Sequence, residues 1–594
     1  MDDHGISALA GDTSETRLER TISSMVWSAW ADALGFISEL TDERGLRRRT
    51  NNVPLTDPIA WKRRVGGKFG VQADLPAGCY SDDTQLRLST ARSISGHGFD
   101  VEAFARVELT LWPAYALGGG RASKAAAAAM TKTSATWYTN FFTGWKDAGG
   151  NGAAMRIQPH VWASRDLDGF GHLEEVICNS VTTHGHPRAL VGAALHATAL
   201  AHALTEGQVP GPDSWGGILQ TVHSGSAVFE RNPELASYWR PRWEMESGLS
   251  LTAAWDETVA ECARMLSDSL PIFNRLVSCS GDVLSDDAAQ AYHQLADSLG
   301  LTDAATRGSG TATVVAALLL AAAFPDHPAD SARLAARAVG TDTDTIATMA
   351  SAVVGAATPT PSPATLVDET YLREEATRLV RVGLGHSAAV FPYPDLLRWT
   401  PPQSQLDSTG LADGRPALAG LGWLEPLAES VHGQDAAWTW MRTSFGPSVL
   451  VKHRLDLKEL QQENWPQLRN RQTEEAAALD GRDRDDQRNR YLQSRGSKDA
   501  VPATHIPAPY PDEADGPSGV PLVNFERRTQ GHSGPTKRGE SSIDVDQVLK
   551  WVAEQHYDES SLGYALRRIA ESGTVEQLAV FVACVRPSIR KLRQ

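Results

Sequence analysis

The feature that most restricts how this chain can fold is a series of alanine- and leucine-rich segments between about Leu18 and Ala357. Examples are "ISSMVWSAWADALGF", "ALVGAALHATALAHAL" and "TATVVAALLLAAAF", each with small residues on one helical face and bounded by Gly, Pro or Asp. Few stretches show the alternation that strands require. Because small residues let helix axes approach closely, the pattern predicts a large all-α domain.

The composition is that of a globular protein, with 594 residues, 41% of them hydrophobic, and a formal net charge of -16. Such a charge gives no general attraction to nucleic acid or to anionic membranes, so we expect neither as a stable partner. The longest apolar run, 312–324, is too short and too rich in alanine to span a bilayer, and it predicts a buried helix.

The cysteines and the N-terminus both favour a cytoplasmic protein. The five cysteines are scattered and form no CxxC pair, which argues against a disulfide framework and against a zinc site. Residues 1–20 are acidic and polar and lack the basic and apolar regions of a signal peptide.

A change of composition after Pro359 predicts further parts beyond the helical domain. We expect the helical domain over 18–365 and a small α+β extension over 366–455, which contains the strand-like "SVLV". A charged and Pro/Gly-rich disordered linker is expected over 456–541. An amphipathic helical unit over 542–594 could dock a protein partner.

Two expected helix starts carry paired acids with hydroxyls: "YSDDTQ" at 80–85 and "GTDTDT" at 340–345. Helix capping explains one acid at each start, because a cap uses one side chain. Four carboxylates brought together would repel unless they were neutralised, and carboxylate and hydroxyl oxygens select Mg²⁺, Mn²⁺ or Ca²⁺. On these residues alone, a two-metal site and simple capping are equally acceptable interpretations. Asp32 and Glu39 add further acids in "WADALGFISEL".

Five segments, taken in order, resemble the ADP-ribosyl-glycohydrolase family, which includes the ADP-ribosylhydrolases and dinitrogenase-reductase-activating glycohydrolases. They are "ADALG…E" at 31–39, "YSDDTQ" at 80–85, "GNGAAMR" at 150–156, "THGHPRA" at 183–189 and "GTDTDTIA" at 340–347. One motif alone would be weak evidence, but five with family-like order and spacing are specific. The resemblance covers roughly residues 20–360.

The resemblance implies a compact orthogonal multi-helix fold with two Mg²⁺ or Mn²⁺ ions. The metal ligands that it implies are Ser81, Asp82, Asp83, Asp342, Asp344 and Thr345. It also implies that Glu39 acts in catalysis by gating the site and approaching a metal when substrate is absent. Without the motif, Glu39 would be a solvated acid at a helix end.

The expected substrate cleft is made of glycine-rich and polar segments. The resemblance implies that Gly150, Asn151, Gly152 and Met155 line the pyrophosphate and ribose, and that His184 contacts the distal ribose or a phosphate. Gly118, Gly119 and Gly120 precede a helical run, where backbone N–H groups could bind phosphate, although a flexible turn explains them equally well.

These expectations give one leading function and two alternatives. The leading one is hydrolysis of the O- or N-glycosidic bond that joins ADP-ribose to a modified target, with metal-activated water and Asp82 or Asp83 as general base. The alternatives are a module that senses ADP-ribose or a nucleotide and signals through the C-terminal extension, and a structural docking protein. The basic clusters Arg47–Arg49 and Lys62–Arg64 are either a solvated face or a holder for an anionic substrate.

Overall fold

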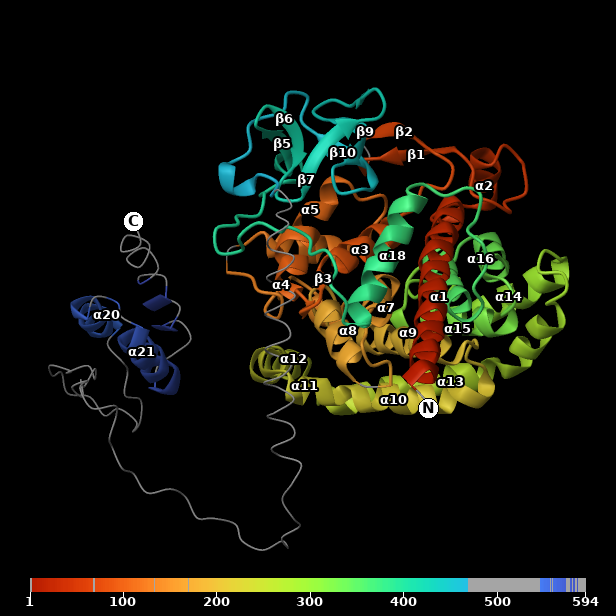
Figure 1. Cartoon of the computed structure of the whole chain (residues 1–594), viewed down its shortest axis with the longest axis horizontal. Coiled ribbons are helices and arrows are strands. Elements are labelled where there is room, and N and C mark those ends of the chain that lie inside the picture. Colours follow the sequence, from red (N-terminus) through yellow and green to blue (C-terminus); the bar gives the residue numbers. More distant parts are fainter. Residues whose placement is uncertain are drawn as a thin grey trace, which may run out of the picture. The chain divides into compact units, whose positions relative to one another are not determined.

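The computed structural model describes residues 3–467, except 68, 69, 133 and 169, and residues 545–585, except 556, 558, 573–576, 579, 580, 583 and 584. Figure 1 shows a large helical body that carries a sheet, and a separate small unit at the C-terminal end of the chain. Most of the linker expected over 456–541 lies outside the described residues.

Helices dominate the first part of the chain, which confirms the all-α prediction. They are α1 (Asp3–Ser38), α2 (Glu43–Arg49), α3 (Asp82–Arg92), α4 (Val101–Ala103), α5 (Leu109–Leu111), α6 (Arg121–Met130), α7 (Gln158–Trp162), α8 (Gly171–Val181), α9 (Pro187–Glu206), α10 (Pro212–Ser224), α11 (Val228–Arg231), α12 (Arg240–Ser247), α13 (Leu251–Ser278), α14 (Asp286–Ser298), α15 (Gly310–Ala323), α16 (Pro328–Arg337), α17 (Thr343–Ala357) and α18 (Glu369–Gly383). The apolar run at 312–324 falls almost entirely in α15, whose side chains are nearly all buried. None of the helices in the described residues is both long and apolar enough to cross a membrane.

The packing of α1 against α17 positions the second acidic motif. At Gly35 of α1 there is no room for a Cβ atom, because the backbone of Thr343 and Asp344 lies directly against it. At the other end of the contact, Gly355 of α17 also packs tightly against the backbone of Ser23, although less closely than Gly35 packs against Asp344. The hydroxyl of Thr343 donates to the carbonyl of Gly35 at 2.8 Å. The small residues therefore bring the start of α17 against the end of α1, as helix packing through small side chains requires.

A hairpin between α2 and α3 was not predicted from the sequence. Strands β1 (Trp61–Val65) and β2 (Val71–Leu75) pair antiparallel, from Trp61 opposite Leu75 to Val65 opposite Val71. Burial alternates along β2, so one face of the hairpin packs inward and the other meets solvent.

The extension is a small antiparallel sheet that follows α18, and this confirms the predicted second, sheet-containing part. Its strands are β5 (Thr409–Ala412), β6 (Arg415–Leu418), β7 (Gly422–Pro426), β8 (Val431–His432), β9 (Ala437–Thr443) and β10 (Ser448–His453). The order is β10-β9-β7-β6-β5, with β8 also paired to β9. The predicted strand "SVLV" forms most of β10.

The sheet packs onto the helical body through a shared apolar cluster and through hydrogen bonds. Leu418 and Val449 of the sheet belong to the same buried cluster as Leu86 of α3. The indole of Trp440 on β9 donates to the carbonyl of Asp74 on β2 at 2.8 Å. The sheet therefore lies beside the β1–β2 hairpin, as Figure 1 shows at the top of the helical body.

The second unit contains two amphipathic helices, α20 (Val545–Glu554) and α21 (Glu559–Ser572), which confirms the predicted C-terminal helical unit. Val548 and Trp551 of α20 pack with Ile569 of α21 in a small core of their own. That this unit docks a protein partner stays a prediction.

Candidate functional site

One cavity of about 1220 Å³ receives side chains or backbone from all five motif segments. Of the residues expected at the site, only Ser81 lies outside its lining. The expected residues that line it are Glu39, Asp82, Asp83, Gly118, Gly119, Gly120, Gly150, Asn151, Gly152, Met155, His184, Asp342, Asp344 and Thr345. Residues from distant parts of the sequence therefore meet at a single site.

The first acidic motif forms the beginning of α3. Ser81 is the N-cap residue, and its hydroxyl accepts a hydrogen bond from the backbone N–H of Asp83 at 3.2 Å. The carboxylate of Asp32 braces the same turn from α1, since it accepts from the N–H of Ser81 at 3.0 Å and from the N–H and hydroxyl of Thr84 at 2.9 and 2.6 Å. Ser81 thus has the capping role that any helix start could use, and Asp32 fixes the motif from outside.

Asp82 points into the cavity but is only 6% exposed. Burial, followed by the charges of Glu39 and Asp32, raises the pKa of Asp82 to about 8, while Lys124 and a backbone hydrogen bond from Gly119 act in the opposite direction. A carboxylate in these surroundings is stabilised by any added positive charge.

Asp83 lies deeper, and its two oxygens differ. Oδ2 is 3.3 Å from the hydroxyl of Ser81, whereas Oδ1 is buried and has no hydrogen-bond partner in the described structure. Burial and the charges of Asp32, Asp82 and Asp342 raise the pKa of Asp83 well above its usual value. A buried acceptor without a partner is rare and indicates that a donor or a cation belongs there.

The second acidic motif reaches the cavity from the start of α17. Asp344 accepts from the N–H of Thr345 at 2.9 Å, and burial, followed by the charge of Glu39, raises the pKa of Asp344 well above normal. Asp342 is the N-cap residue but makes no side-chain cap; instead its Oδ2 accepts from the amide of Asn151 at 3.0 Å. The capping interpretation therefore fails for Asp342, whose carboxylate is directed to the cavity segment that holds Asn151.

The donor set fits a hard divalent cation in its chemistry. Among the described residues, no three His, Cys, Asp or Glu side chains converge closely enough to hold a metal ion as they stand. The available donors are nevertheless carboxylate and hydroxyl oxygens, and the unpartnered Oδ1 of Asp83 lies among them.

Glu39, at the end of α1, is held by an arginine from the hairpin. Both Nη atoms of Arg63 lie 3.2 Å from Oε2 of Glu39, and the guanidinium also lies 4.3 Å from the centre of the Phe36 ring. Burial raises the pKa of Glu39, and Arg63 opposes this shift. Glu39 is thus an ion-paired side chain at the cavity wall and not a solvated acid.

Steric constraints require glycine at the first position of the turn at 118–120. Gly118 adopts φ +119°, and a Cβ atom there would collide with Oδ1 of Asp82. Gly120 is the N-cap residue of α6, so the turn does lead into a helix start at the cavity. This geometry suits a phosphate, with Lys124 one turn along the helix and also in the cavity wall.

The Gly-Asn-Gly segment and His184 form a second part of the wall. The N–H of Asn151 donates to the carbonyl of Gly308 at 3.0 Å, and the ring of His184 lies against Gly152. Arg156 donates to the hydroxyl oxygen of Thr183 at 2.8 Å, and that hydroxyl is 2.7 Å from Nδ1 of His184. The hydroxyl is also 3.5 Å from the carbonyl oxygen of Ser180, but Nδ1 is much nearer. When the hydroxyl donates to Nδ1, Nε2–H is left as a donor for a ligand.

Burial and the nearby Arg156 lower the pKa of His184 to about 3. The imidazole is therefore neutral near pH 7 and does not act as a cation toward phosphate. Arg156 is itself fully buried and donates to the carbonyl of Gly152 and to Asn179, so it holds the wall together and does not contact a ligand.

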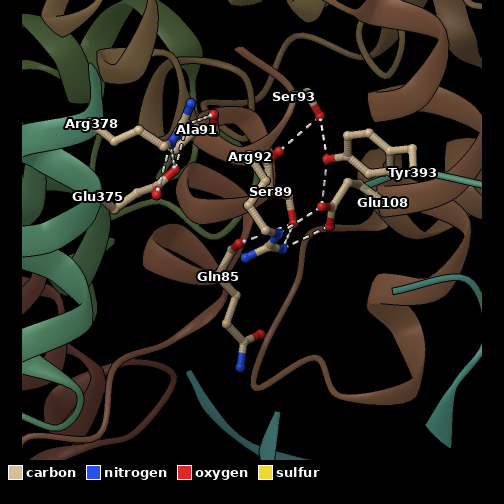
Figure 2. Close-up of polar contacts among 9 residues, drawn as sticks. All are labelled: Gln85, Ser89, Ala91, Arg92, Ser93, Glu108, Glu375, Arg378 and Tyr393. Atoms are coloured by element: carbon tan, nitrogen blue, oxygen red, sulfur yellow. Dashed lines mark hydrogen bonds and ion pairs between the residues drawn. The ribbon is translucent and has the colours of Figure 1, made fainter. Parts of the chain in front are cut away.

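Figure 2 shows the polar contacts that anchor the second half of α3. Arg92 forms a buried ion pair with Glu108, with two N–O distances of 2.7 Å. Tyr393 donates to the same carboxylate at 2.8 Å and lies 3.0 Å from the hydroxyl of Ser93. Arg378 of α18 binds carbonyl oxygens at and just beyond the end of α3. The helix that begins with the acid pair is thus fixed at its far end by segments from outside the motifs.

Comparison with known proteins agrees with these motifs. Residues 13–386 match the family model described as ADP-ribosylglycohydrolase. The chain belongs to the ADP-ribosylglycohydrolase family. It is accordingly a hydrolase of the ADP-ribosylhydrolase type. A solved structure described as an ADP-ribosylglycohydrolase-related protein complex is similar at 20% identity, over 62% of this chain and 99% of that one, with a TM-score of 0.38. No curated protein matches the chain.

The structure of this family member also places at the site residues that the sequence did not single out for these roles. They include Arg63 and Lys124, and four residues beyond the matched residues 13–386. Of these four, Trp438, Leu450 and Lys452 lie on strands of the sheet, and Gln405 lies in a short helical turn before it. For Arg63 a signal existed, because the basic cluster 62–64 was considered as a holder of anions. For the sheet residues none existed, because their position depends on how the sheet packs against the helical body.

Proposed function

We propose that this protein hydrolyses the glycosidic bond between ADP-ribose and a modified target, with the help of two Mg²⁺ or Mn²⁺ ions. The observation that carries the proposal is the meeting of Asp82, Asp83, Asp342 and Asp344 at one cavity in a member of this family. The cavity also contains the glycine turns and the neutral His184, which suit phosphate and ribose.

The proposed metal ligands are Ser81, Asp82, Asp83, Asp342, Asp344 and Thr345. The ions would supply Lewis-acid charge that orients the ribose hydroxyls and lowers the pKa of a water molecule. The raised pKa values of Asp83 and Asp344 support this assignment, because burial and the charges of neighbouring carboxylates cause them, and a bound cation would oppose both effects.

In the proposed reaction, Asp82 or Asp83 accepts a proton from the attacking water, whose oxygen bonds to the anomeric carbon of the distal ribose. The glycosidic bond breaks, its electron pair moves to the oxygen or nitrogen of the target, and that atom takes up the proton from the carboxylate. The positive charge that develops on the ribose lies among carboxylates, which stabilise it.

The remaining residues would bind and orient the substrate. Gly118–Gly120 and the N-terminus of α6 would take the pyrophosphate, and Asn151 and His184 Nε2–H would donate to the ribose or a phosphate. Glu39 would move between Arg63 and the site as substrate enters and leaves. A reducing, cytoplasmic compartment fits the four described cysteines, which are all free.

The test is release of ADP-ribose from defined ADP-ribosylated peptides and oligonucleotides by the full chain, with Mg²⁺, Mn²⁺ or EDTA. We expect metal-dependent release, and a loss of at least about 100-fold in Asp82→Asn and Asp344→Asn. Asp326→Asn is the matched control, since Asp326 is exposed and does not line the cavity. Full release in EDTA would refute the metal mechanism, and tight binding of ADP-ribose without any turnover would indicate the sensing function instead.

A further inference from the structure

The sheet outside the matched family region forms part of the wall of the proposed active site. Lys452 and Leu450 lie two positions apart on β10, so both side chains project from the same face of the sheet. Trp438 lies directly opposite Lys452 on β9. All three line the cavity that contains Asp82 and Glu39.

The hairpin and the sheet together make one continuous surface at this wall. Gly66, at the end of β1, packs so closely on the Trp438 ring that a Cβ atom would not fit. The ammonium of Lys452 lies 5.4 Å from the centre of the same ring. Arg64 and Val65 of the hairpin line the cavity beside Gly66. We call Leu40, Arg64, Val65, Trp438, Leu450 and Lys452 the outer wall.

The cavity has more room than one small ligand needs. Its volume is about 1220 Å³, whereas small-molecule sites typically occupy about 300–1,000 Å³. The outer wall belongs to this cavity but lies outside the five motif segments and the glycine turn. It is therefore available to contact the part of a substrate that is not ADP-ribose.

The outer wall is cationic although the whole chain has a net charge of -16. Its charged members are Arg64 and Lys452. Glu39, which precedes Leu40 and lines the same cavity, is neutralised by its ion pair with Arg63. In the described part of the chain Lys452 forms no ion pair, and the Trp438 ring holds its ammonium in place. This charge is complementary to an acidic partner.

The outer wall also offers apolar contacts. Leu40 is 63% exposed and adopts φ 47°, a left-handed conformation that is unfavourable for leucine. Val65, which is half-buried, provides further apolar surface, whereas Leu450 is almost fully buried beneath it. Trp438, in contrast, is 7% exposed and covered by Gly66 and Lys452, so its face is not open for a base to stack on. Cations with aliphatic side chains and without an open aromatic face fit a peptide better than a nucleic acid.

We propose that the outer wall binds acidic residues of a protein target next to the ADP-ribosylated side chain and so determines which targets are hydrolysed. This inference rests on the proposed function, because it concerns the part of the substrate that is not ADP-ribose. Lys452 is the specificity-determining residue.

The test compares three ADP-ribosylated peptides that differ only in acidic, neutral or basic residues around the modified side chain. For the full chain we expect kcat/KM to be about 10-fold higher with acidic than with neutral flanks, and the difference to shrink at high salt. Lys452→Glu should remove or reverse this preference, chiefly through KM. Lys452→Gln should reduce it and is the milder variant if the charge reversal disturbs folding.

Lys458→Glu is the matched control, because Lys458 is exposed, follows the same sheet and does not line the cavity. Equal hydrolysis of the three peptides, or equal effects of the changes at Lys452 and Lys458, would overturn the inference and leave the proposed function intact. Failure to hydrolyse any ADP-ribosylated peptide or oligonucleotide would overturn both. Preference for an ADP-ribosylated oligonucleotide that depends on Lys452 would replace the peptide with a nucleic acid.

Discussion

Arg63 of the hairpin and Glu39 at the end of α1 form a largely buried ion pair at the cavity wall, with side-chain exposures of 15% and 16%. The pair joins the element that was not predicted from the sequence to the first motif. Without Arg63, the Glu39 carboxylate would keep its burial and the repulsion from Asp342 and Asp32 but lose its main compensation. The hairpin is therefore part of the electrostatic balance of the site.

The first prediction tests this pair with a double-mutant cycle. Arg63→Gln should lower the free energy of unfolding more in the wild type than in a Glu39→Gln background, with a coupling of about 1–2 kcal/mol, because both charges are largely removed from solvent. Denaturant unfolding of the four proteins measures it. Lys62→Gln is the control on the same strand: Lys62 pairs with Asp74 in the open, and this change should cost less than about 0.5 kcal/mol. A coupling near zero would contradict the prediction.

The second prediction concerns the brace on the acidic motif. Thr84→Val keeps the shape of the side chain but removes the hydroxyl that donates to Asp32 at 2.6 Å. We expect a loss of about 1–3 kcal/mol in the free energy of unfolding, since a buried carboxyl oxygen loses a donor. Thr84→Ser keeps the donor and loses only a methyl group, so it should lower the free energy of unfolding by about 1 kcal/mol. Denaturant unfolding measures both variants. If Thr84→Ser lowers the free energy of unfolding as much as Thr84→Val does, packing of the methyl group and not the hydrogen bond stabilises the turn.

The third prediction concerns the glycine turn beside Asp82. Gly118→Ala introduces a side chain at φ +119° that collides with Oδ1 of Asp82. We expect a loss of about 100-fold or more in kcat/KM, because Asp82 must move. Gly216→Ala, on the exposed side of α10 with open space around it, is the control and should raise stability by about 0.5–1 kcal/mol. Unchanged kinetics in Gly118→Ala would show that Asp82 tolerates displacement.

The all-α body was predictable because its signal is local and repeated. Helical periodicity and small residues act over a few turns, and they led directly to α15. The particular contact between Gly35 and the start of α17 was not predicted. The site residues were predictable only through the family motifs. The pairing of carboxylates from α3 and α17 depends on packing that no local pattern encodes.

The outer wall illustrates what the sequence could not predict. Trp438 and Lys452 read locally as parts of two ordinary strands, and nothing near them indicates a cavity. Their position follows from the contact of the sheet with Gly66 and Asp74, hundreds of residues earlier in the chain. Short strands such as β1 and β2 are also poorly marked, because β1 has three charges among its five residues, and five-residue strands of this kind resemble a solvated loop.

The fourth prediction is a pH dependence of stability caused by His196. Nε2 of this buried ring is 3.0 Å from the Gln158 amide, whose oxygen accepts from Arg87. The amide nitrogen therefore donates to Nε2, and the ring must be neutral. Burial and Arg87 lower the pKa of His196 to about 3.

An unfolded histidine titrates near pH ~6.5. Between these pH values the unfolded state binds the additional proton, so stability falls as the pH falls below about 6.5, by up to about 1.4 kcal/mol per pH unit for this group. Unfolding free energies between about pH 7.5 and 5 measure the slope. His196→Gln should make the slope of stability against pH shallower by the contribution of one proton. Replacement of the exposed His432 should leave the slope unchanged. An unchanged slope in His196→Gln would contradict the assignment.

The fifth prediction separates metal binding from helix capping. If Asp344 binds metal, the effect of Asp344→Asn on the free energy of unfolding should change sign when the ions are added. Asp344→Asn keeps the Oδ1 acceptor for the N–H of Thr345 but removes one of several mutually repelling buried carboxylates. In EDTA the variant should be at least as stable as the wild type. With Mg²⁺ or Mn²⁺ at about 100 times its dissociation constant, the wild type should gain about 2.7 kcal/mol and the variant clearly less. Thermal or denaturant unfolding measures both effects without any substrate, with Asp326→Asn as the control that should follow the wild type. If Asp344 only capped the helix, Asp344→Asn would be less stable than the wild type or equally stable. The difference in the free energy of unfolding would then be the same with and without the ions.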